Sequence, residues 1–377
     1  MSDPEAASST WALVAGGGTA GHLLPGLAVA AALVARGHDP STIHFVGSDR
    51  GVEATLVPEA GFTFDELPGR GIQRRFTAAN LGAALGLARG TSRGVGIVRR
   101  RRPAVVVVLG GHASFACGVG AVVTRTPLVL LEQNIRAGAV NRVLRRFATA
   151  SAVSFEGTDL PRAVVTGNPL RPELREAAAI PDPAAAREAL GLPAGRTVVA
   201  VFSGSLGSRR INTAVRALVE RWAGRSDLAV RHVAGRRDWA EVAADRPALA
   251  PGGLAYQLVE YEDRMDLLLS ASDVAVTRAG GTVAELAAFG VPAVLVPLPI
   301  APRDHQTANA RAVEAAGGAV VVADDELDVD RLERELEGLV DHPTRLATMA
   351  AAMRSMARPD AADRVAELVE ASARTSP

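Results

Sequence analysis

The sequence contains one cysteine, Cys117, among 377 residues. A single cysteine excludes a disulfide within the chain and is typical of proteins from a reducing compartment. Positive and negative side chains are also balanced, with 41 Lys plus Arg and 41 Asp plus Glu. The net charge therefore gives no sign of nucleic-acid binding, and we expect no nucleic-acid partner.

The sequence also lacks an unbroken apolar run long enough to span a membrane. The longest apolar stretch, residues 104–123, is interrupted by Gly110-Gly111-His112 and by Ser114. This pattern predicts a buried strand, a turn and the start of a helix. The first five residues lack the basic start and apolar core of a signal peptide. We therefore expect a cytosolic chain with no transmembrane segment.

Short apolar strands alternate with alanine-rich helical segments along the chain. Most of the strands are rich in valine and apolar on both faces, as parallel strands covered by helices are. The alternation predicts the α/β class, with doubly wound Rossmann-like sheets. The expected strands are 11–15, 42–46, 104–109, 127–131, 152–155, 163–166, 197–202, 229–234, 254–259, 273–277 and 293–296.

The chain is long enough for two domains of ordinary size. The alternation restarts after Pro181-Asp182-Pro183, so we expect a first domain over residues 1–168 and a second over 169–359. We expect the last helix, within 360–371, to return to the first domain. Two such domains facing each other would leave a cleft at the carboxyl ends of their strands, where this architecture binds ligands.

Two glycine-rich turns, one in each half, follow an apolar strand and open a helix. The first is residues 16–22 (GGGTAGH) and the second is residues 203–210 (SGSLGSRR). Glycine permits a sharp turn, and a helix N-terminus offers unpaired N–H groups and positive partial charge. Each turn is therefore a candidate phosphate site, with a purely structural turn as the alternative. His22 could bind phosphate or act as a base, or it could only cap the helix.

Three further polar clusters follow expected strands. Residues 132–134 are polar at the end of an apolar strand, which suits either a cleft or a solvated loop. After Thr277, the turn Gly280-Gly281 leads into a helix that carries Glu285 on its first turn. Glu285 could accept both hydroxyls of a ribose, or form a capping box with Thr282. Residues 303–309 form the third cluster.

Together these segments resemble the MurG family of N-acetylglucosaminyltransferases. The resemblance is carried, in order, by GGGTAGHLLPGLAVA, GGHAS, LEQN, GNPLR, SGSLGSRRIN, RAGGTVAEL and DHQTANA, and it spans nearly the whole chain. It implies two Rossmann-like domains in the glycosyltransferase-B fold, inversion at the sugar carbon and no required metal or other cofactor. The implied substrates are UDP-N-acetylglucosamine and undecaprenyl-diphospho-N-acetylmuramoyl-pentapeptide, which accepts the sugar on its C4 hydroxyl.

The resemblance also implies roles for individual residues. The first glycine turn would face a diphosphate, Asn134 would lie near the transferred sugar, and Glu285 would hold the ribose. Arg171 and Ser205 would contact the donor's phosphates or sugar. The substrate-binding and catalytic residues expected in this way are Thr19, Ala20, Gly21, His22, Asn134, Arg171, Ser205, Thr282, Glu285, Gln306 and Asn309.

The implied acceptor is a membrane lipid, and one segment could dock the chain peripherally on the cytoplasmic face of the membrane. Residues 70–102 combine basic and apolar side chains, a composition that suits an anionic inner leaflet. The alternative is an ordinary packed helix with solvated arginines. The residues expected at the membrane are Arg74, Arg75, Phe76, Leu81, Leu85 and Arg89. Other cell-wall synthesis proteins are further expected partners.

Two other classes of protein fit the same pattern of strands. One is an epimerase acting on UDP-N-acetylglucosamine, which would need no lipid-docking segment. The other is a non-catalytic nucleotide-sugar-binding module, for which Glu285 and the second glycine turn would suffice. The crowded first glycine turn would then have no explanation.

Overall fold

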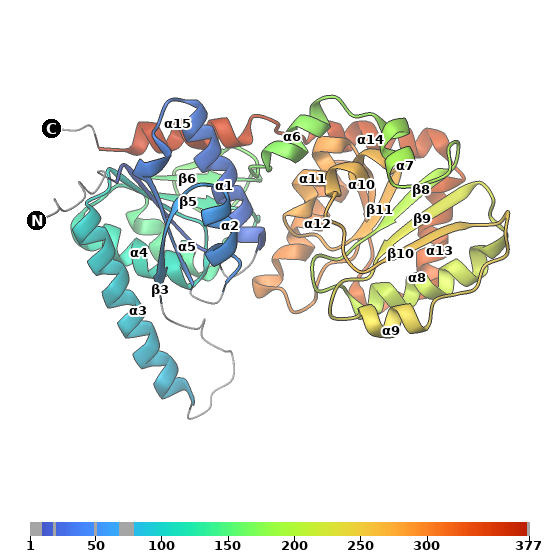
Figure 1. The fold of residues 1–377 in the computed structure, drawn as a ribbon, viewed down its shortest axis with the longest axis horizontal. Coiled ribbons are helices and arrows are strands. Elements are labelled where there is room, and N and C mark those ends of the chain that lie inside the picture. Colours follow the sequence, from blue (N-terminus) through green and yellow to red (C-terminus); the bar gives the residue numbers. More distant parts are fainter. Residues whose placement is uncertain (1–9, 18–19, 49–50, 68–78, 375–377) are drawn as a thin grey trace, which may run out of the picture. The chain divides into compact units, whose positions relative to one another are not determined.

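The structure is a computed structural model that describes residues 10–17, 20–48, 51–67 and 79–374. The chain divides into two compact units (Figure 1). Unit 1 contains residues 1–171 and 360–377, and unit 2 contains residues 172–359. The expected boundary between residues 168 and 169 lies close to this division. Within the described ranges, no helix combines the length and apolarity needed to cross a membrane.

Unit 1 is built on a parallel sheet with the strand order β3-β2-β1-β4-β5-β6-β7. Its central strands β1, β4 and β5 are buried along their whole length, because helices cover both faces of the sheet. The strands are β1 (Ala12–Ala15), β2 (Ile43–Ser48), β3 (Thr63–Leu67), β4 (Val105–Val108), β5 (Leu128–Glu132), β6 (Ala150–Val153) and β7 (Ala163–Val165).

The last helix of the chain, α15, packs on unit 1 and contacts α1 (Figure 1). Val365 and Val369 of α15 are buried in the core of this unit. The Arg36 guanidinium lies 2.8 Å from a carboxylate oxygen of Glu370 and fixes the outer side of the helix. The helices of unit 1 are α1 (Ala20–Ala35), η1 (Pro40–Thr42), α2 (Glu53–Glu59), α3 (Ala79–Arg101), α4 (Gly111–Thr124), α5 (Ala139–Leu144), η2 (Arg145–Phe147) and α15 (Ala361–Ser372).

Unit 2 repeats this architecture with a parallel sheet in the order β10-β9-β8-β11-β12-β13. The strands are β8 (Thr197–Val201), β9 (Leu228–Val233), β10 (Ala255–Val259), β11 (Val274–Thr277), β12 (Ala293–Leu295) and β13 (Ala319–Val321). The helices are α6 (Pro172–Ala179), α7 (Pro183–Ala189), α8 (Arg209–Arg221), η3 (Trp222–Gly224), α9 (Trp239–Ala244), α10 (Met265–Ala271), α11 (Thr282–Phe289), η4 (Pro302–Asp304), α12 (His305–Ala315), η5 (Asp324–Glu326), α13 (Val329–Val340) and α14 (Pro343–Ser355).

The expected class, two Rossmann-like parallel α/β sheets, is confirmed. Each expected strand is present, although β6 begins two residues earlier than predicted. The sequence did not reveal β3 and β13, which are edge strands of their sheets. β3 is mostly exposed or half-buried and includes Asp65 and Glu66, while β13 is very short. β3 therefore lacks the apolar run that marks the central strands, whereas β13 lies in a five-residue apolar run, residues 319–323 (AVVVA), that was overlooked.

A buried histidine joins three elements of unit 2. His232 on β9 is fully buried, and its Nε2 lies 2.9 Å from Asn212 Oδ1 on α8. Its Nδ1 lies 3.0 Å from the Tyr256 hydroxyl on β10. Burial lowers the pKa of His232 to about 4 and raises the pKa of Tyr256 to about 12. His232 is therefore neutral in the folded protein at neutral pH.

We expect unit 2 to lose stability as the pH falls from about 6.5 to about 4. The unfolded chain binds a proton at His232 near its ordinary pKa of about 6.5, whereas the folded chain does so only near pH 4. The free energy of unfolding therefore has its full value above about pH 6.5 and falls by about 3 kcal/mol as the pH decreases to about 4. Urea unfolding followed by tryptophan fluorescence measures this change in stability. The experiment uses the variant Trp11→Phe, whose remaining tryptophans lie in unit 2. His232→Gln should show a flatter pH dependence, and an unchanged slope would contradict this assignment.

Candidate active site

In unit 1, two glycine turns meet where the strand order reverses. Gly16-Gly17 follows β1 and Gly110-Gly111 follows β4, and β1 and β4 are neighbours in the sheet. A Cβ atom on Gly111 would lie 2.8 Å from the Gly17 carbonyl oxygen, so only glycine allows the turns to approach this closely. A Cβ atom on Gly110 would lie 2.9 Å from Cδ2 of His22, so the imidazole rests against this turn. This reversal point is where open α/β sheets bind ligands.

The turn after β4 is fixed by Ser114, a buried serine that in the sequence only marked a break in an apolar run. Ser114 Oγ accepts the N–H groups of Leu109 and Gly110, at 3.1 and 2.9 Å. It also lies 2.5 Å from the Ala15 carbonyl oxygen on β1. Ser114 therefore ties the turn after β4 to the end of β1, which holds the surroundings of His22 in place.

The polar cluster after β5 is organised by a buried carboxylate. Glu132 is 4% exposed, and its Oε1 accepts both the backbone N–H and the side-chain amide of Asn134, each at 3.1 Å. Its Oε2 accepts the N–H of Gly138 at 2.8 Å and Asn141 Nδ2 at 3.0 Å. Glu132 thus holds the half-buried Asn134 side chain in a defined position at the carboxyl edge of the sheet.

The other residues predicted for unit 1 are placed as follows. Thr19 lies outside the described residues, Ala20 begins α1, and Gly21 is exposed on its first turn. His22 is half-buried. Arg171 is half-buried at the end of the first segment of unit 1.

The membrane-docking prediction is only partly covered by the structure. Arg74, Arg75 and Phe76 lie outside the described residues. Leu81 and Leu85 belong to α3, and Arg89 is exposed on the same helix.

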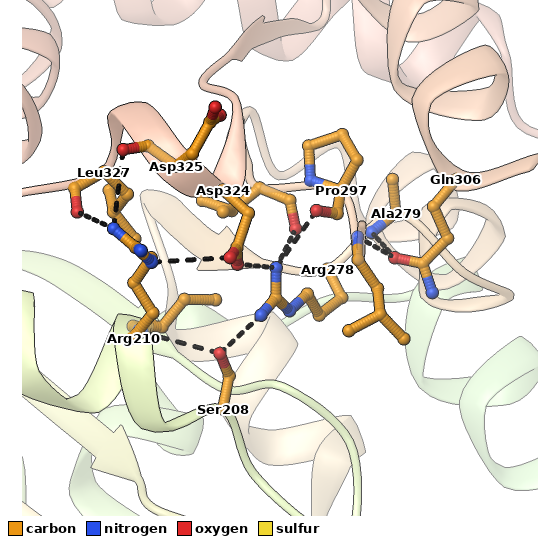
Figure 2. Close-up of polar contacts among 12 residues, drawn as sticks. Ser208, Arg210, Arg278, Ala279, Pro297, Gln306, Asp324, Asp325 and Leu327 are labelled. Atoms are coloured by element: carbon orange, nitrogen blue, oxygen red, sulfur yellow. Dashed lines mark hydrogen bonds and ion pairs between the residues drawn. The ribbon is translucent and has the colours of Figure 1, made fainter. Parts of the chain in front are cut away.

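In unit 2, one arginine joins the segments that follow four parallel strands (Figure 2). Arg278, directly after β11, donates from Nη1 to the carbonyl oxygens of Val296 and Pro297 at 3.0 and 3.1 Å. The same nitrogen lies 2.6 Å from Asp324 Oδ1. Nη2 donates to Ser208 Oγ at 2.6 Å. The planar guanidinium therefore connects the turn before α8, the turn after β11, the loop after β12 and the loop after β13.

Gln306 and Asn309, on α12, bind the backbone of the turn after β11. Gln306 Oε1 accepts the N–H groups of Ala279 and Leu298 at 3.3 and 2.9 Å (Figure 2). Asn309 Nδ2 donates to the Ala279 carbonyl oxygen at 3.1 Å. The Asn309 side chain is fully buried, which does not fit the expected direct contact with a sugar hydroxyl. Its role is corrected to that of a residue that positions the turn.

The capping-box alternative for Glu285 is wrong. Thr282 is the first residue of α11 and Gly281 is its N-cap, with no side-chain capping bond. Glu285 is half-buried on the first turn of this helix. Ser205 is exposed in the turn before α8, whereas Ser208 is the N-cap residue of that helix.

Sequence reasoning missed Ser208 and Asp324 as parts of this site. Ser208 carried a usable signal, because serine is a preferred N-cap residue directly before a helical pattern. Asp324 also had a signal, because it directly follows the apolar run of residues 319–323 that contains the unrecognised strand β13.

The sequence matches the N-terminal domain of glycosyltransferase family 28 over residues 12–153 and its C-terminal domain over residues 198–365. The curated UDP-N-acetylglucosamine--N-acetylmuramyl-(pentapeptide) pyrophosphoryl-undecaprenol N-acetylglucosamine transferase of Salinibacter ruber is 40% identical over 363 residues, which covers 94% of each chain. The crystal structure of Acinetobacter baumannii MurG is similar with a TM-score of 0.76 and 26% identity, over 96% of this chain and 99% of that one.

Because both domain models match, the chain is a two-domain glycosyltransferase of family 28. Within that class, the chain belongs to the MurG family. A UDP-GlcNAc 2-epimerase from Neisseria meningitidis, solved bound to UDP-GlcNAc, is also similar, with a TM-score of 0.66 over 96% of this chain and 99% of that one. Its identity of 14% shows a shared fold only.

Proposed function

We propose that this enzyme transfers N-acetylglucosamine from UDP-N-acetylglucosamine to the C4 hydroxyl of undecaprenyl-diphospho-N-acetylmuramoyl-pentapeptide. The observation that carries the proposal is the 40% identity, across 94% of the chain, to a transferase named for these substrates. The two carboxyl-edge sites support it, because each supplies glycine turns and a helix N-terminus for phosphate groups.

The transfer reaction requires stabilisation of the negative charge that develops on the leaving group. The acceptor hydroxyl attacks C1 of the sugar from the face opposite UDP, so the diphosphate gains negative charge in the transition state. Oriented N–H groups and arginine are suited to stabilise this charge. One helix N-terminus contributes about 0.3–2 kcal/mol, so several donors must act together. His22 is our candidate for the base that takes the hydroxyl proton, and we propose that no metal is required.

One assay distinguishes the three classes of protein. The enzyme is incubated with UDP-N-acetylglucosamine, with and without the lipid acceptor. A transferase releases UDP and extends the lipid only when the acceptor is present. Formation of an epimer of the sugar in the absence of acceptor, either free with release of UDP or still linked to UDP, would indicate an epimerase, and binding without turnover would indicate a binding module.

We expect Glu285→Ala to raise the donor KM by about 10- to 100-fold. A carboxylate that binds ribose hydroxyls makes charge-assisted hydrogen bonds worth roughly 1.5–3 kcal/mol. Steady-state kinetics and UDP calorimetry measure the change. Glu241→Ala, on the exposed surface of α9, is the matched control and should leave both quantities unchanged. Wild-type donor KM and UDP affinity in Glu285→Ala would contradict the ribose assignment.

We also propose that unit 1 docks on an anionic membrane surface. The C-terminal half of α3 packs on α4, where Gly94 lies against Ala116, and Figure 1 shows the helix extending beyond the sheet. Its exposed arginines include Arg89, Arg93, Arg99 and Arg100. Basic side chains near an anionic leaflet contribute about 1 kcal/mol each.

The short segment formed by α5 and η2 supports the same proposal. Val143 and Phe147 are 59% and 57% exposed, and they alternate with the exposed Arg142, Arg145 and Arg146. Exposed apolar side chains beside arginines suit the interface between lipid headgroups and acyl chains. α4 contacts both α3 and α5, so these basic surfaces belong to neighbouring helices.

We expect the triple variant Arg74→Glu, Arg75→Glu, Arg89→Glu to be released from anionic vesicles. Its activity on a short, water-soluble acceptor should stay intact, because the substituted side chains dock the protein and do not react. Co-sedimentation with phosphatidylglycerol vesicles measures the first effect. The matched control reverses three exposed arginines of unit 2: Arg264, Arg311 and Arg345. Unchanged co-sedimentation of the arginine-to-glutamate variant would show that residues 70–102 form an ordinary packed segment that does not bind the membrane.

A further inference from the structure

A buried carboxylate lies beneath the first glycine turn. Glu53, the first residue of α2, is 1% exposed. Its Oε1 accepts the backbone N–H of Ser48, the last residue of β2, at 2.8 Å. A carboxylate at this depth is costly to desolvate unless N–H or cationic donors surround it. Its position therefore calls for a function that an apolar side chain could not provide.

Three glycines lie against the Glu53 side chain: Gly17 in the turn after β1, Gly47 in β2 and Gly51 in the turn before α2. A Cβ atom on Gly17, after β1, or on Gly51, before α2, would collide with the Glu53 carboxylate group. A Cβ atom on Gly47 would collide with its Cγ and lie 3.1 Å from Oε1. The carboxylate is thus in contact with the backbone of the turn after β1 and of the turn after β2. Glycine at position 17 is required for this close approach as well as for its φ of +136°.

The contacts continue from Gly17 to the candidate base. The Gly17 carbonyl oxygen lies against Gly111, and the neighbouring Gly110 lies against the His22 ring. The Gly16-Gly17 turn is therefore enclosed between the Glu53 carboxylate and the Gly110-Gly111 turn that Ser114 fixes. A displacement of Glu53 would therefore move the Gly16-Gly17 turn and, through it, the Gly110-Gly111 turn that contacts the His22 ring.

We propose that Glu53 is a positioning residue for the transfer reaction, which sets the Gly16-Gly17 turn and through it His22. Its burial leaves no surface for a substrate, so it acts through the turn and not on the reacting atoms. The inference rests on the proposed transfer to the lipid acceptor. A neutral amide of the same shape still offers an oxygen to Ser48, but it replaces one acceptor oxygen with a donor, and the turn shifts.

The test compares Glu53→Gln with Asp65→Asn in the full-length enzyme. Asp65, on the neighbouring strand β3, is a carboxylate that pairs with His44 and Arg101, so its loss controls for a general loss of stability in unit 1. We expect Glu53→Gln to lower kcat by about 10²-fold, since small misplacements of reacting groups cost this much. UDP affinity, which belongs to unit 2, should stay within about twofold, and Asp65→Asn should keep its kcat.

A double-mutant cycle with His22→Ala gives the decisive readout. If Glu53 acts through His22, the double variant should be no slower than His22→Ala alone. Multiplicative effects, or a Glu53→Gln kcat equal to that of Asp65→Asn, would overturn the proposal. If Glu53→Gln does not fold, Glu53→Asp, which keeps the charge and withdraws it by one methylene, replaces it in the same cycle. Absence of transfer in the unmodified enzyme would instead refute the proposed function.

Discussion

Replacing His22 with alanine should lower kcat by about 10²- to 10⁴-fold while the donor KM stays near its wild-type value. A general base contributes a factor of this size, and a group that acts only in the transition state changes kcat more than KM. His22 is half-buried on the first full turn of α1. Its ring rests against Gly110 at the reversal point of the unit 1 sheet, where an acceptor diphosphate would bind.

The pH profile separates the two roles that His22 could have. If it is the base, the acidic limb of the kcat/KM profile should disappear in His22→Ala. If it binds phosphate, the acceptor KM should rise and the limb should remain. His38→Gln is the matched control, because this imidazole stacks on Trp11 and pairs with Glu370, away from the glycine turns. If kcat and KM of His22→Ala stay at their wild-type values, His22 contributes only to the start of α1, and another residue must act as the base.

The sequence was informative wherever one short segment carries the signal. A valine-rich run predicted β4 and a leucine-rich run predicted β5, and paired glycines directly after apolar runs predicted the turns that follow β1 and β4. These features depend on hydrophobic periodicity and on backbone conformations that few residues allow. β3 carries neither signal, because its side chains are mostly exposed or half-buried and include Asp65 and Glu66.

The site was less predictable because its geometry depends on contacts between distant segments. Glu132 was grouped with its polar neighbours, yet it is the residue that positions Asn134. Asn309 was expected to touch the sugar, whereas it binds the backbone of the turn after β11. Arg278 contacts Ser208 and Asp324, which are 70 and 46 positions away in the chain. No local pattern specifies such a partner, so burial and pairing had to come from the structure.

Replacing Arg278 with alanine should destabilise unit 2 by about 3 kcal/mol and weaken UDP binding by about 10²-fold or more. The side chain is 14% exposed and Asp324 is 17% exposed, so the truncation leaves a largely buried carboxylate without its nearest cation. It also removes the donor to the Val296 and Pro297 carbonyl oxygens and to Ser208. The turns that are expected to hold the nucleotide would then lose their common connection, and misplacement by about 1 Å is costly.

Two further variants test whether the planar guanidinium itself is required. Arg278→Lys keeps a positive charge near Asp324 and should recover part of the stability. It should not recover UDP affinity, because one ammonium group cannot span four acceptors on three separate segments. Arg210→Ala is the matched control for stability. Arg210 reaches the other oxygen of Asp324 at 3.4 Å (Figure 2) but is 47% exposed, so its loss should cost less than about 1 kcal/mol. Thermal unfolding and UDP calorimetry measure both quantities. Wild-type UDP affinity in Arg278→Lys would show that the nucleotide site does not depend on this connection. Equal losses of stability in Arg278→Ala and Arg210→Ala would contradict the special role of Arg278 as well.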